Sequence, residues 1–328
     1  MTHVTSSPAA PPLDPELAAA LALQLGGDPS PIGIDDVAVK RAEEAQVALE
    51  VLEQIKERDL VVVEGTATSH DGAHVPVSVV HRKDRGPSSP VILYIHGGGM
   101  MMGNRWSGAD VIFDWVEHYN AVVATVEYRL APEHPFPAPQ EDCYAALVWL
   151  EESSRRLGVN LEAGLVAGIS AGAGLAASVC LMARDRGGPR VGGQLLLAPM
   201  LDDRNDSVSA RQFPRGMWNR QENELGWRSL LGPLHGADDV PYVAAPARCA
   251  DLRGLPPAFI EVGSAEVFRD EAVEYASKLW AAGGEAELHV WAGGFHGFQT
   301  FDHTALARAS AGALRSWMDR RLGFTGRA

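Results

Sequence analysis

Short runs of apolar residues, rich in valine, leucine and isoleucine, recur along the chain from residue 59 onward. Runs of this kind, bounded by glycine, proline and polar residues, are typical of β-strands, and wholly apolar runs are typical of strands buried on both faces of a sheet. They predict strands at Asp59–Thr66, His74–His81, Val91–Ile95, Ala121–Val126, Leu165–Ala167, Gly193–Leu197, Ala258–Val262 and Ala286–Val290. The turn signal Asp71-Gly72 between the first two predicts an antiparallel pair at the edge of the sheet.

Longer stretches with helical spacing lie between these runs. They predict helices at about Ala109–Tyr119, Pro139–Leu157, Gly174–Arg186 and Glu266–Ala282, and an amphipathic helix at Ala305–Leu322. Alternation of strand and helix from residue 91 onward is the pattern of a parallel sheet with helices on both faces. The predicted fold class is therefore α/β, with a mostly parallel, doubly wound sheet.

Two segments depart from this alternation. Helices at Leu17–Leu25 and Asp35–Lys56 precede every predicted strand, and residues 201–250 interrupt the alternation with only a weak helical pattern near Gln221–Leu231. An insertion of roughly 50 residues is too long for a plain loop. The predicted organisation is N-terminal cap helices at 1–56, a catalytic α/β domain from 57–200 and 251–328, and a second cap insertion at 201–250.

Composition narrows the possible partners. The chain has 328 residues and a formal net charge of −14, which argues against a nucleic-acid-binding surface and against attraction to anionic membranes. It has no basic region followed by an apolar signal segment, and no apolar run approaches the roughly 20 residues of a membrane span. The expectation is a soluble, cytoplasmic protein. A homodimer is compatible with these observations, and the oligomeric state stays open.

Metal and disulfide chemistry find little support in the sequence. The three cysteines, Cys143, Cys180 and Cys249, are widely spaced, and no Cys-x-x-Cys or Cys/His cluster occurs. Such spacing favours reduced cysteines in the core over a disulfide framework or a zinc site. No metal and no cofactor are expected.

A candidate nucleophile stands where an apolar strand run meets an alanine-rich helix run. The motif is Gly168-Ile169-Ser170-Ala171-Gly172, and glycines two residues before and after a serine allow the sharp turn that exposes a nucleophile above a sheet. The serine would also lie at a helix N-terminus, where the helix dipole favours a developing negative charge. The alternative is a tight turn with an uninvolved serine, and the presence of partner residues weighs against it.

A serine hydroxyl needs a base and a group that orients the base. His296 is the best candidate base, because it lies in the glycine-flanked loop Gly293–Phe298 directly after the last predicted strand. Glu266 and Asp270 both follow the strand Ala258–Val262 and are both candidates for the orienting acid. Glu266 is favoured because it stands nearer the end of the strand. His289 alternates with apolar residues inside a strand and is interpreted as structural.

The run His96-Gly97-Gly98-Gly99 follows the buried strand Val91–Ile95. Glycines allow backbone N–H groups to turn toward a substrate oxyanion, as in oxyanion loops of the His-Gly-Gly-Gly type. A phosphate-binding loop is the alternative. It is disfavoured because no lysine follows and neither glycine-rich phosphate motif is satisfied.

These motifs, together with Glu127-Tyr-Arg-Leu-Ala-Pro-Glu133 and Phe295-His-Gly-Phe298, resemble the hormone-sensitive-lipase-like family of bacterial α/β-hydrolase carboxylesterases. The resemblance implies an α/β-hydrolase fold with a helical cap, in the expected chain order of serine, acid and histidine. It implies that Ser170 is the nucleophile and His296 the base, and that the backbone amides of Gly98, Gly99 and Ala171 form the oxyanion hole. Within that family, Arg129 and Glu133 would be structural ion-pair members.

The chain departs from the family pattern at two places. Ile169 stands before the serine, where many members have aspartate. The expected acid is usually an aspartate followed by proline and leucine, whereas this chain has Glu266-Val267-Phe268. A glutamate is chemically competent, but its extra methylene requires a slightly different backbone position.

The predicted function is a serine carboxylesterase that acts on short-to-medium acyl esters through Ser170, Glu266 and His296. Lactone, amide, carbamate or peptide hydrolysis on the same residues stays open, as does ligand binding without catalysis on the same fold. Met100, Met101, Met102 and Trp106 follow the oxyanion motif and are predicted either to line the substrate pocket or to pack in the core. Trp218 is expected to reach the pocket from the second cap segment.

Overall fold

The computed structural model describes residues 8–25, 31–86, 89–213 and 217–324. Within these residues, eight strands form one sheet in the order β1-β2-β4-β3-β5-β6-β7-β8. The strands are β1 Leu60–Thr68, β2 His74–Arg82, β3 Val91–Ile95, β4 Val122–Val126, β5 Leu165–Ile169, β6 Gly193–Leu197, β7 Ala258–Gly263 and β8 Ala286–Trp291. β1 and β2 pair antiparallel, β2 pairs antiparallel with β4, and the remaining neighbours are parallel.

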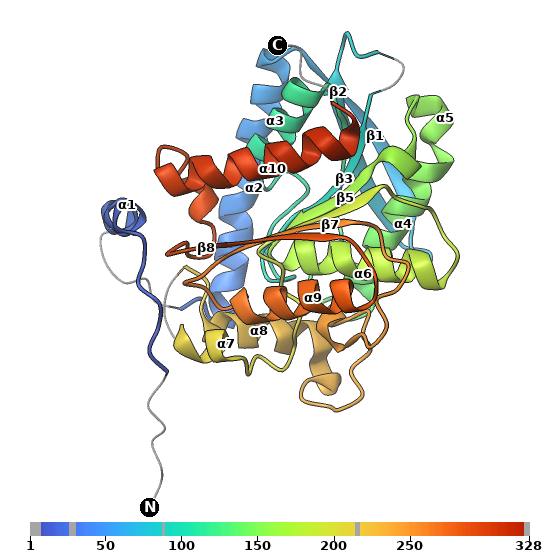
Figure 1. Cartoon of the computed structure of the whole chain (residues 1–328). Helices are drawn as coiled ribbons and strands as arrows, with labels where there is room; N and C mark the ends of the chain where they lie inside the picture. Colours follow the sequence, from blue (N-terminus) through green and yellow to red (C-terminus); the bar gives the residue numbers. More distant parts are fainter. Residues whose placement is uncertain (1–7, 26–30, 87–88, 214–216, 325–328) are drawn as a thin grey trace, which may run out of the picture.

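Helices cover both faces of this sheet (Figure 1). Side chains of α3 and α10 pack with one set of strand residues, and side chains of α4, α6 and α9 pack with the other set. The helices are α1 Pro15–Leu25, α2 Val37–Glu57, α3 Ala109–Tyr119, α4 Ala138–Glu152, α5 Ser154–Leu157, α6 Ala171–Asp185, α7 Val208–Gln212, α8 Arg220–Leu231, α9 Arg269–Ala281 and α10 Ala305–Leu322. The predicted doubly wound, mostly parallel α/β architecture is confirmed.

Burial along the strands follows their position in the sheet. Every residue of the central strands β3, β4 and β6 is buried, as expected for parallel strands covered by helices on both faces. The edge strands β1 and β8 are only half-buried along most of their length. The parallel strands end at one edge of the sheet, and the loops that follow them carry the predicted site residues.

Some predicted helix boundaries were wrong, and the local contacts explain why. The helix expected from Glu266 begins at Arg269, because the Glu266 side chain accepts a hydrogen bond from the Gly263 N–H at 2.6 Å and so stays in the turn after β7. The helix expected from Gly174 begins at Ala171, directly after Ser170. The single helix expected at 139–157 is divided into α4 and α5.

The two predicted cap segments meet each other. The N–H of Ile32, in the first segment, donates a hydrogen bond of 3.0 Å to Glu222 on α8, in the second segment. Val51 and Ile55 near the end of α2 pack into the core beside α3, so this helix also lies against the α/β body. Across the described ranges, no helix has the length and apolar character needed to cross a membrane.

Arg129 and Glu133 each form an ion pair, but with different partners. The Arg129 guanidinium contacts the buried Asp142 at 2.7 Å and Asp71 at 2.7 Å. The hydrogen bond from Arg129 lowers the pKa of Asp71 to about 2. Glu133 pairs instead with Arg41 of α2 at 2.9 Å. Arg129 therefore ties the loop after β4 to α4 and to the β1–β2 hairpin.

We expect the change Arg129→Met to lower the free energy of unfolding by about 3 kcal/mol, because it leaves the Asp142 carboxylate buried without a cation. The matched control Arg253→Met removes an exposed ion pair with Asp251, so its effect on the free energy of unfolding should be much smaller. Urea unfolding of both variants measures the difference. Equal losses in the two variants would contradict the assignment.

Candidate active site

Ser170 occupies the sharp turn between β5 and α6 in an uncommon backbone conformation. Its φ of 58° lies in a region that residues with a side chain rarely adopt. A Cβ on Gly168 would lie 2.2 Å from the carbonyl oxygen of Gly172, and a Cβ on Gly172 would lie 2.1 Å from that of Ile95. Only glycine allows strand, turn and helix to approach this closely, which explains the spacing of the motif.

Ser170, His296 and Glu266 form a chain of hydrogen bonds. The Nε2 atom of His296 lies 3.1 Å from the Oγ of Ser170, and its Nδ1 lies 2.6 Å from a carboxylate oxygen of Glu266. A carboxylate only accepts hydrogen bonds, so Nδ1 carries the hydrogen and Nε2 presents its lone pair to the serine hydroxyl. The predicted residues come together from three loops, after β5, β7 and β8.

Of the two candidate acids, Glu266 contacts His296 and Asp270 does not. The Glu266 side chain is almost fully buried, which protects its contact with the histidine from solvent. Asp270 lies at the start of α9, where it accepts a hydrogen bond from the Ser209 N–H at 2.7 Å and pairs with Arg269 at 2.8 Å. Asp270 therefore attaches the segment around α7 to α9.

The loop after β3 places unpaired amides beside the serine. A Cβ on Gly97 would lie 3.2 Å from the Cβ of Ser170, so this loop packs directly against the serine. Gly98 and Gly99 have φ values of 104° and 61°, which favour glycine. Among the described residues, none accepts a hydrogen bond from the backbone N–H of Gly98, Gly99 or Ala171. The first N–H groups of a helix have no partner within it, which accounts for Ala171.

His96 supports this loop and stays uncharged. Burial lowers its pKa to about 4. Its Nδ1 lies 2.8 Å from the carbonyl oxygen of Gly97, and its ring stacks on Tyr128 with centroids 4.2 Å apart. The Tyr128 hydroxyl donates to the carbonyl oxygen of His96 at 3.0 Å. These contacts give His96 a structural role in this loop.

A cavity of about 900 Å³ opens beside Ser170 and His296. Ile169 and Leu197 contribute apolar side chains to its lining, and Trp218 approaches His296 with ring centroids 6.5 Å apart. The remaining lining comes largely from α3, from α10 and from the loop after β3 (residues 96–103), which is called the oxyanion loop below. In the part of the chain described, no group of three or more His, Cys, Asp or Glu residues could hold a metal ion.

The structure decides between the two interpretations of the residues after the oxyanion motif. Met102 lines the cavity, as does Trp218. Met100 and Met101 pack instead in the core on the α6 side of the sheet, and Trp106 packs with α3 on the other side. The oxyanion loop folds back on itself after Gly99, which directs the first two methionines away from the cavity.

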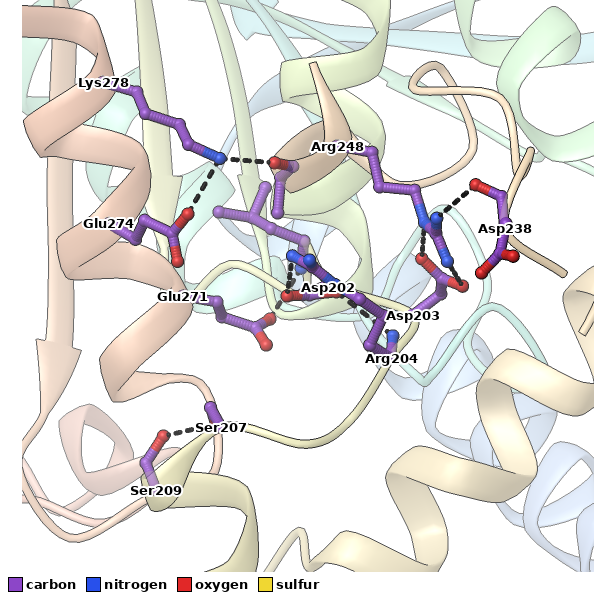
Figure 2. A network of polar contacts seen from close by, with 12 residues as sticks. Asp202, Asp203, Arg204, Ser207, Ser209, Asp238, Arg248, Glu271, Glu274 and Lys278 are labelled. Atoms are coloured by element: carbon purple, nitrogen blue, oxygen red, sulfur yellow. Dashed lines mark hydrogen bonds and ion pairs between the residues drawn. The ribbon is translucent and has the colours of Figure 1, made fainter. Parts of the chain in front are cut away.

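A polar network attaches residues 201–250 to α9 (Figure 2). Glu271 accepts a hydrogen bond from the Leu201 N–H at 2.7 Å, and burial raises its pKa well above the ordinary value. Lys278 donates to the carbonyl oxygen of Ala247 at 2.7 Å. Both ends of the segment are therefore fixed to one helix.

Family comparison agrees with this geometry. A family model described as "alpha/beta hydrolase fold" matches residues 92–300, which is more than half of the chain. The chain belongs to the α/β-hydrolase family. The matched residues run from β3 to the loop that carries His296, so they include the oxyanion loop, Ser170 and Glu266.

Among curated relatives, Carboxylesterase NlhH of Mycobacterium tuberculosis is 33% identical over 283 residues, which cover 84% of this chain and 86% of that protein. Esterase LipI of the same organism is 37% identical over 202 residues, which cover 61% of this chain and 63% of LipI. A solved structure titled "Bacterial Heroin Esterase" superposes with a TM-score of 0.87 at 36% identity, and covers 94% of this chain and 98% of that one. The predicted membership of the hormone-sensitive-lipase-like branch of this α/β-hydrolase family is confirmed.

The two candidate acids make a direct test. We expect Glu266→Gln to lower kcat by about 10⁴-fold, because an amide no longer selects the Nδ1–H tautomer of His296. Asp270→Asn, the matched change four residues further along the chain, should leave kcat within about tenfold, because it weakens only contacts of α9. Steady-state kinetics on one chromogenic ester measures both variants. The opposite ranking would assign the acid to Asp270.

Proposed function

We propose that this protein is a carboxylesterase that hydrolyses short-to-medium acyl esters through Ser170, His296 and Glu266. The observation that carries the proposal is the hydrogen-bonded chain of these residues beside the unpaired amides of the oxyanion loop. Relatives over most of the chain are named carboxylesterases and esterases, which supports the same reaction class.

In acylation, the Ser170 hydroxyl attacks the ester carbonyl carbon while His296 Nε2 takes the hydroxyl proton. The tetrahedral oxyanion accepts hydrogen bonds from the amides of Gly98, Gly99 and Ala171. Glu266 stabilises the imidazolium and keeps its orientation. The proton on Nε2 then passes to the departing alkoxide, the alcohol leaves, and the acyl group stays bound to Oγ.

Deacylation repeats these steps with water as the nucleophile. His296 Nε2 takes a proton from the water as its oxygen attacks the acyl carbon, and the same amides bind the second oxyanion. Collapse of this intermediate releases the carboxylic acid and returns the proton from Nε2 to Ser170 Oγ. The enzyme is restored without a metal or cofactor in any step.

The cavity supports the substrate range. Its volume of about 900 Å³ lies within the usual range for small-molecule sites, and Ile169 and Leu197 present aliphatic surface next to the serine. Ester substrates with short-to-medium acyl chains would bury that chain against aliphatic side chains, which favours binding by about 0.8 kcal/mol for each buried methylene.

The two flanking segments act as the cap in this proposal. Ile32 and Glu44 from residues 1–56, and Trp218 from residues 201–250, contribute to the lining of the cavity. The hydrogen bond between Ile32 and Glu222 joins the two segments beside the same cavity. A cap of this kind separates the site from bulk solvent and limits the size of the acyl chain.

The test is a p-nitrophenyl ester series from acetate to laurate, measured with the wild type and with Ser170→Ala. We expect turnover to be greatest for short-to-medium chains and to fall by about 10⁵–10⁶-fold in Ser170→Ala. An organophosphate should label Ser170 of the wild type, as read by mass spectrometry of its peptides. Thermal unfolding of both proteins checks that the substitution leaves the fold intact.

Turnover by Ser170→Ala near the wild-type rate would overturn the nucleophile assignment. Labelling of Ser170 without hydrolysis of any ester would direct the search to lactones, amides and carbamates, which use the same acyl-enzyme path. A wild type that neither hydrolyses esters nor takes the label would point to ligand binding without catalysis.

A further inference from the structure

The turn that carries the Gly98 and Gly99 amides is held from outside the sheet, by Arg41 of α2. The Nε atom of Arg41 donates to the carbonyl oxygen of Met101 at 2.7 Å, and an Nη atom donates to that of Ala131 at 2.8 Å. The same guanidinium contacts both carboxylate oxygens of Glu133 at 2.9 Å. One side chain therefore joins α2 to the oxyanion loop and to the loop after β4.

Glu44 lies one helical turn after Arg41 and therefore on the same face of α2. Its carboxylate accepts a hydrogen bond from the Gly103 N–H at 2.5 Å. Its backbone carbonyl accepts another from the Asn104 side chain at 3.2 Å. Arg41 thus holds a carbonyl in the middle of the loop and Glu44 holds an amide at its end, both from a single rigid helix.

The loop needs such support because its backbone is irregular and, at Met100, strained. Residues Gly98, Gly99, Met100 and Gly103 have φ values of 104°, 61°, 61° and 92°. Backbone in sparsely populated regions persists only when the surrounding contacts over-determine it. Inside the turn, the N–H groups of Met101 and Met102 both donate to the carbonyl oxygen of Gly98. A displacement at Met101 is therefore passed directly to the peptide group that contains the Gly98 carbonyl and the Gly99 N–H.

We propose that Arg41 and Glu44 are positioning residues for the oxyanion hole, which makes α2 part of the apparatus that stabilises the transition state. The inference rests on the proposed esterase function. Neither side chain contacts the serine or the histidine in the hydrogen-bond network, so each acts through the loop. A misplacement of about 1 Å in catalytic groups costs about 10²-fold in rate, so loss of either anchor is expected to lower kcat.

A purely structural role for these residues makes a different prediction. If Arg41 and Glu44 only attached α2 to the body, their loss would lower the amount of folded enzyme or alter the cap, and would change KM or stability. Arg41→Ala leaves no buried charge without a partner, because the side chain of Glu133, which loses its ion pair, is 57% exposed. The folded state should therefore survive, which makes kcat for each competent active site a meaningful readout.

The experiment compares Arg41→Ala, Arg41→Lys, Glu44→Ala and Glu44→Gln with the wild type, and uses Lys40→Ala as the matched control. Lys40 lies on the same helix, and its one ion pair within the described residues is with the exposed Glu43. End-point organophosphate labelling counts the competent serines in each preparation. Each variant is then measured for kcat, for KM, and for the affinity of a boronic acid, whose tetrahedral adduct on the serine places an oxygen in the oxyanion hole.

We expect Arg41→Ala and Glu44→Ala to lower kcat by about 10- to 100-fold and to weaken boronic acid binding by a similar factor, with KM changed by less than about threefold. Glu44→Gln should keep most of the activity, because an amide oxygen can still accept from the Gly103 N–H. Arg41→Lys should be intermediate, because an ammonium cannot reproduce the planar set of contacts. Lys40→Ala should match the wild type.

Two results would overturn the positioning role while leaving the esterase proposal intact. One is wild-type kcat in both alanine variants. The other is a loss that appears in KM or in the count of competent serines, with unchanged boronic acid affinity. A wild type that hydrolyses no ester but is labelled at Ser170 still tests the inference, through the labelling rates of the variants. Absence of both turnover and labelling in the wild type would overturn the proposed function, and this inference with it.

Discussion

The geometry of the candidate site depends on one constraint, the strained turn at Ser170. A residue with a side chain is held at a φ of 58° because β5 and α6 leave the turn no other path. Close contacts around Ser170 hold this unfavourable backbone conformation in place. Gly172 packs against the backbone of Ile95, and Gly97 packs against Ser170 itself. The hydroxyl is thereby held above the sheet, within reach of both the histidine and the oxyanion loop.

The parallel sheet brings the other groups to this point. β3, β5 and β7 end at the same edge as β8, so loops that are distant in the sequence lie together there. Glu266, at the end of β7, and His296, after β8, are brought within 2.6 Å of each other. Burial of the Glu266 carboxylate strengthens that contact, and the carboxylate selects one histidine tautomer because it only accepts hydrogen bonds.

Much of this could be predicted from local patterns. The apolar runs indicated the strands, because buried parallel strands have few polar positions, and Gly168-x-Ser170-x-Gly172 indicated the turn, because its glycines have a steric cause. Spacing favoured Glu266 over Asp270 but did not decide the choice. That choice depends on the turn before α9, in which Glu266 faces back toward Gly263 and Asp270 faces Ser209.

The roles of more distant residues had no local signal. Arg41 is separated in sequence from its partners Met101 and Ala131 by 60 and 90 positions. No local pattern distinguishes it from an ordinary surface arginine of the same helix. The placement of the Met100 and Met101 side chains in the core could not be predicted from the sequence either, because it depends on a loop with several positive φ values. Long-range contacts and irregular backbone, rather than the regular elements, set the limit of prediction here.

The most direct test of this account is a crystal structure of the enzyme after reaction with a phosphonate ester, which forms a tetrahedral adduct on the nucleophile. We expect phosphorus bonded to Ser170 Oγ, and a phosphonyl oxygen within about 3 Å of the backbone nitrogens of Gly98, Gly99 and Ala171. An adduct on another residue, or a phosphonyl oxygen directed away from these three amides, would contradict it.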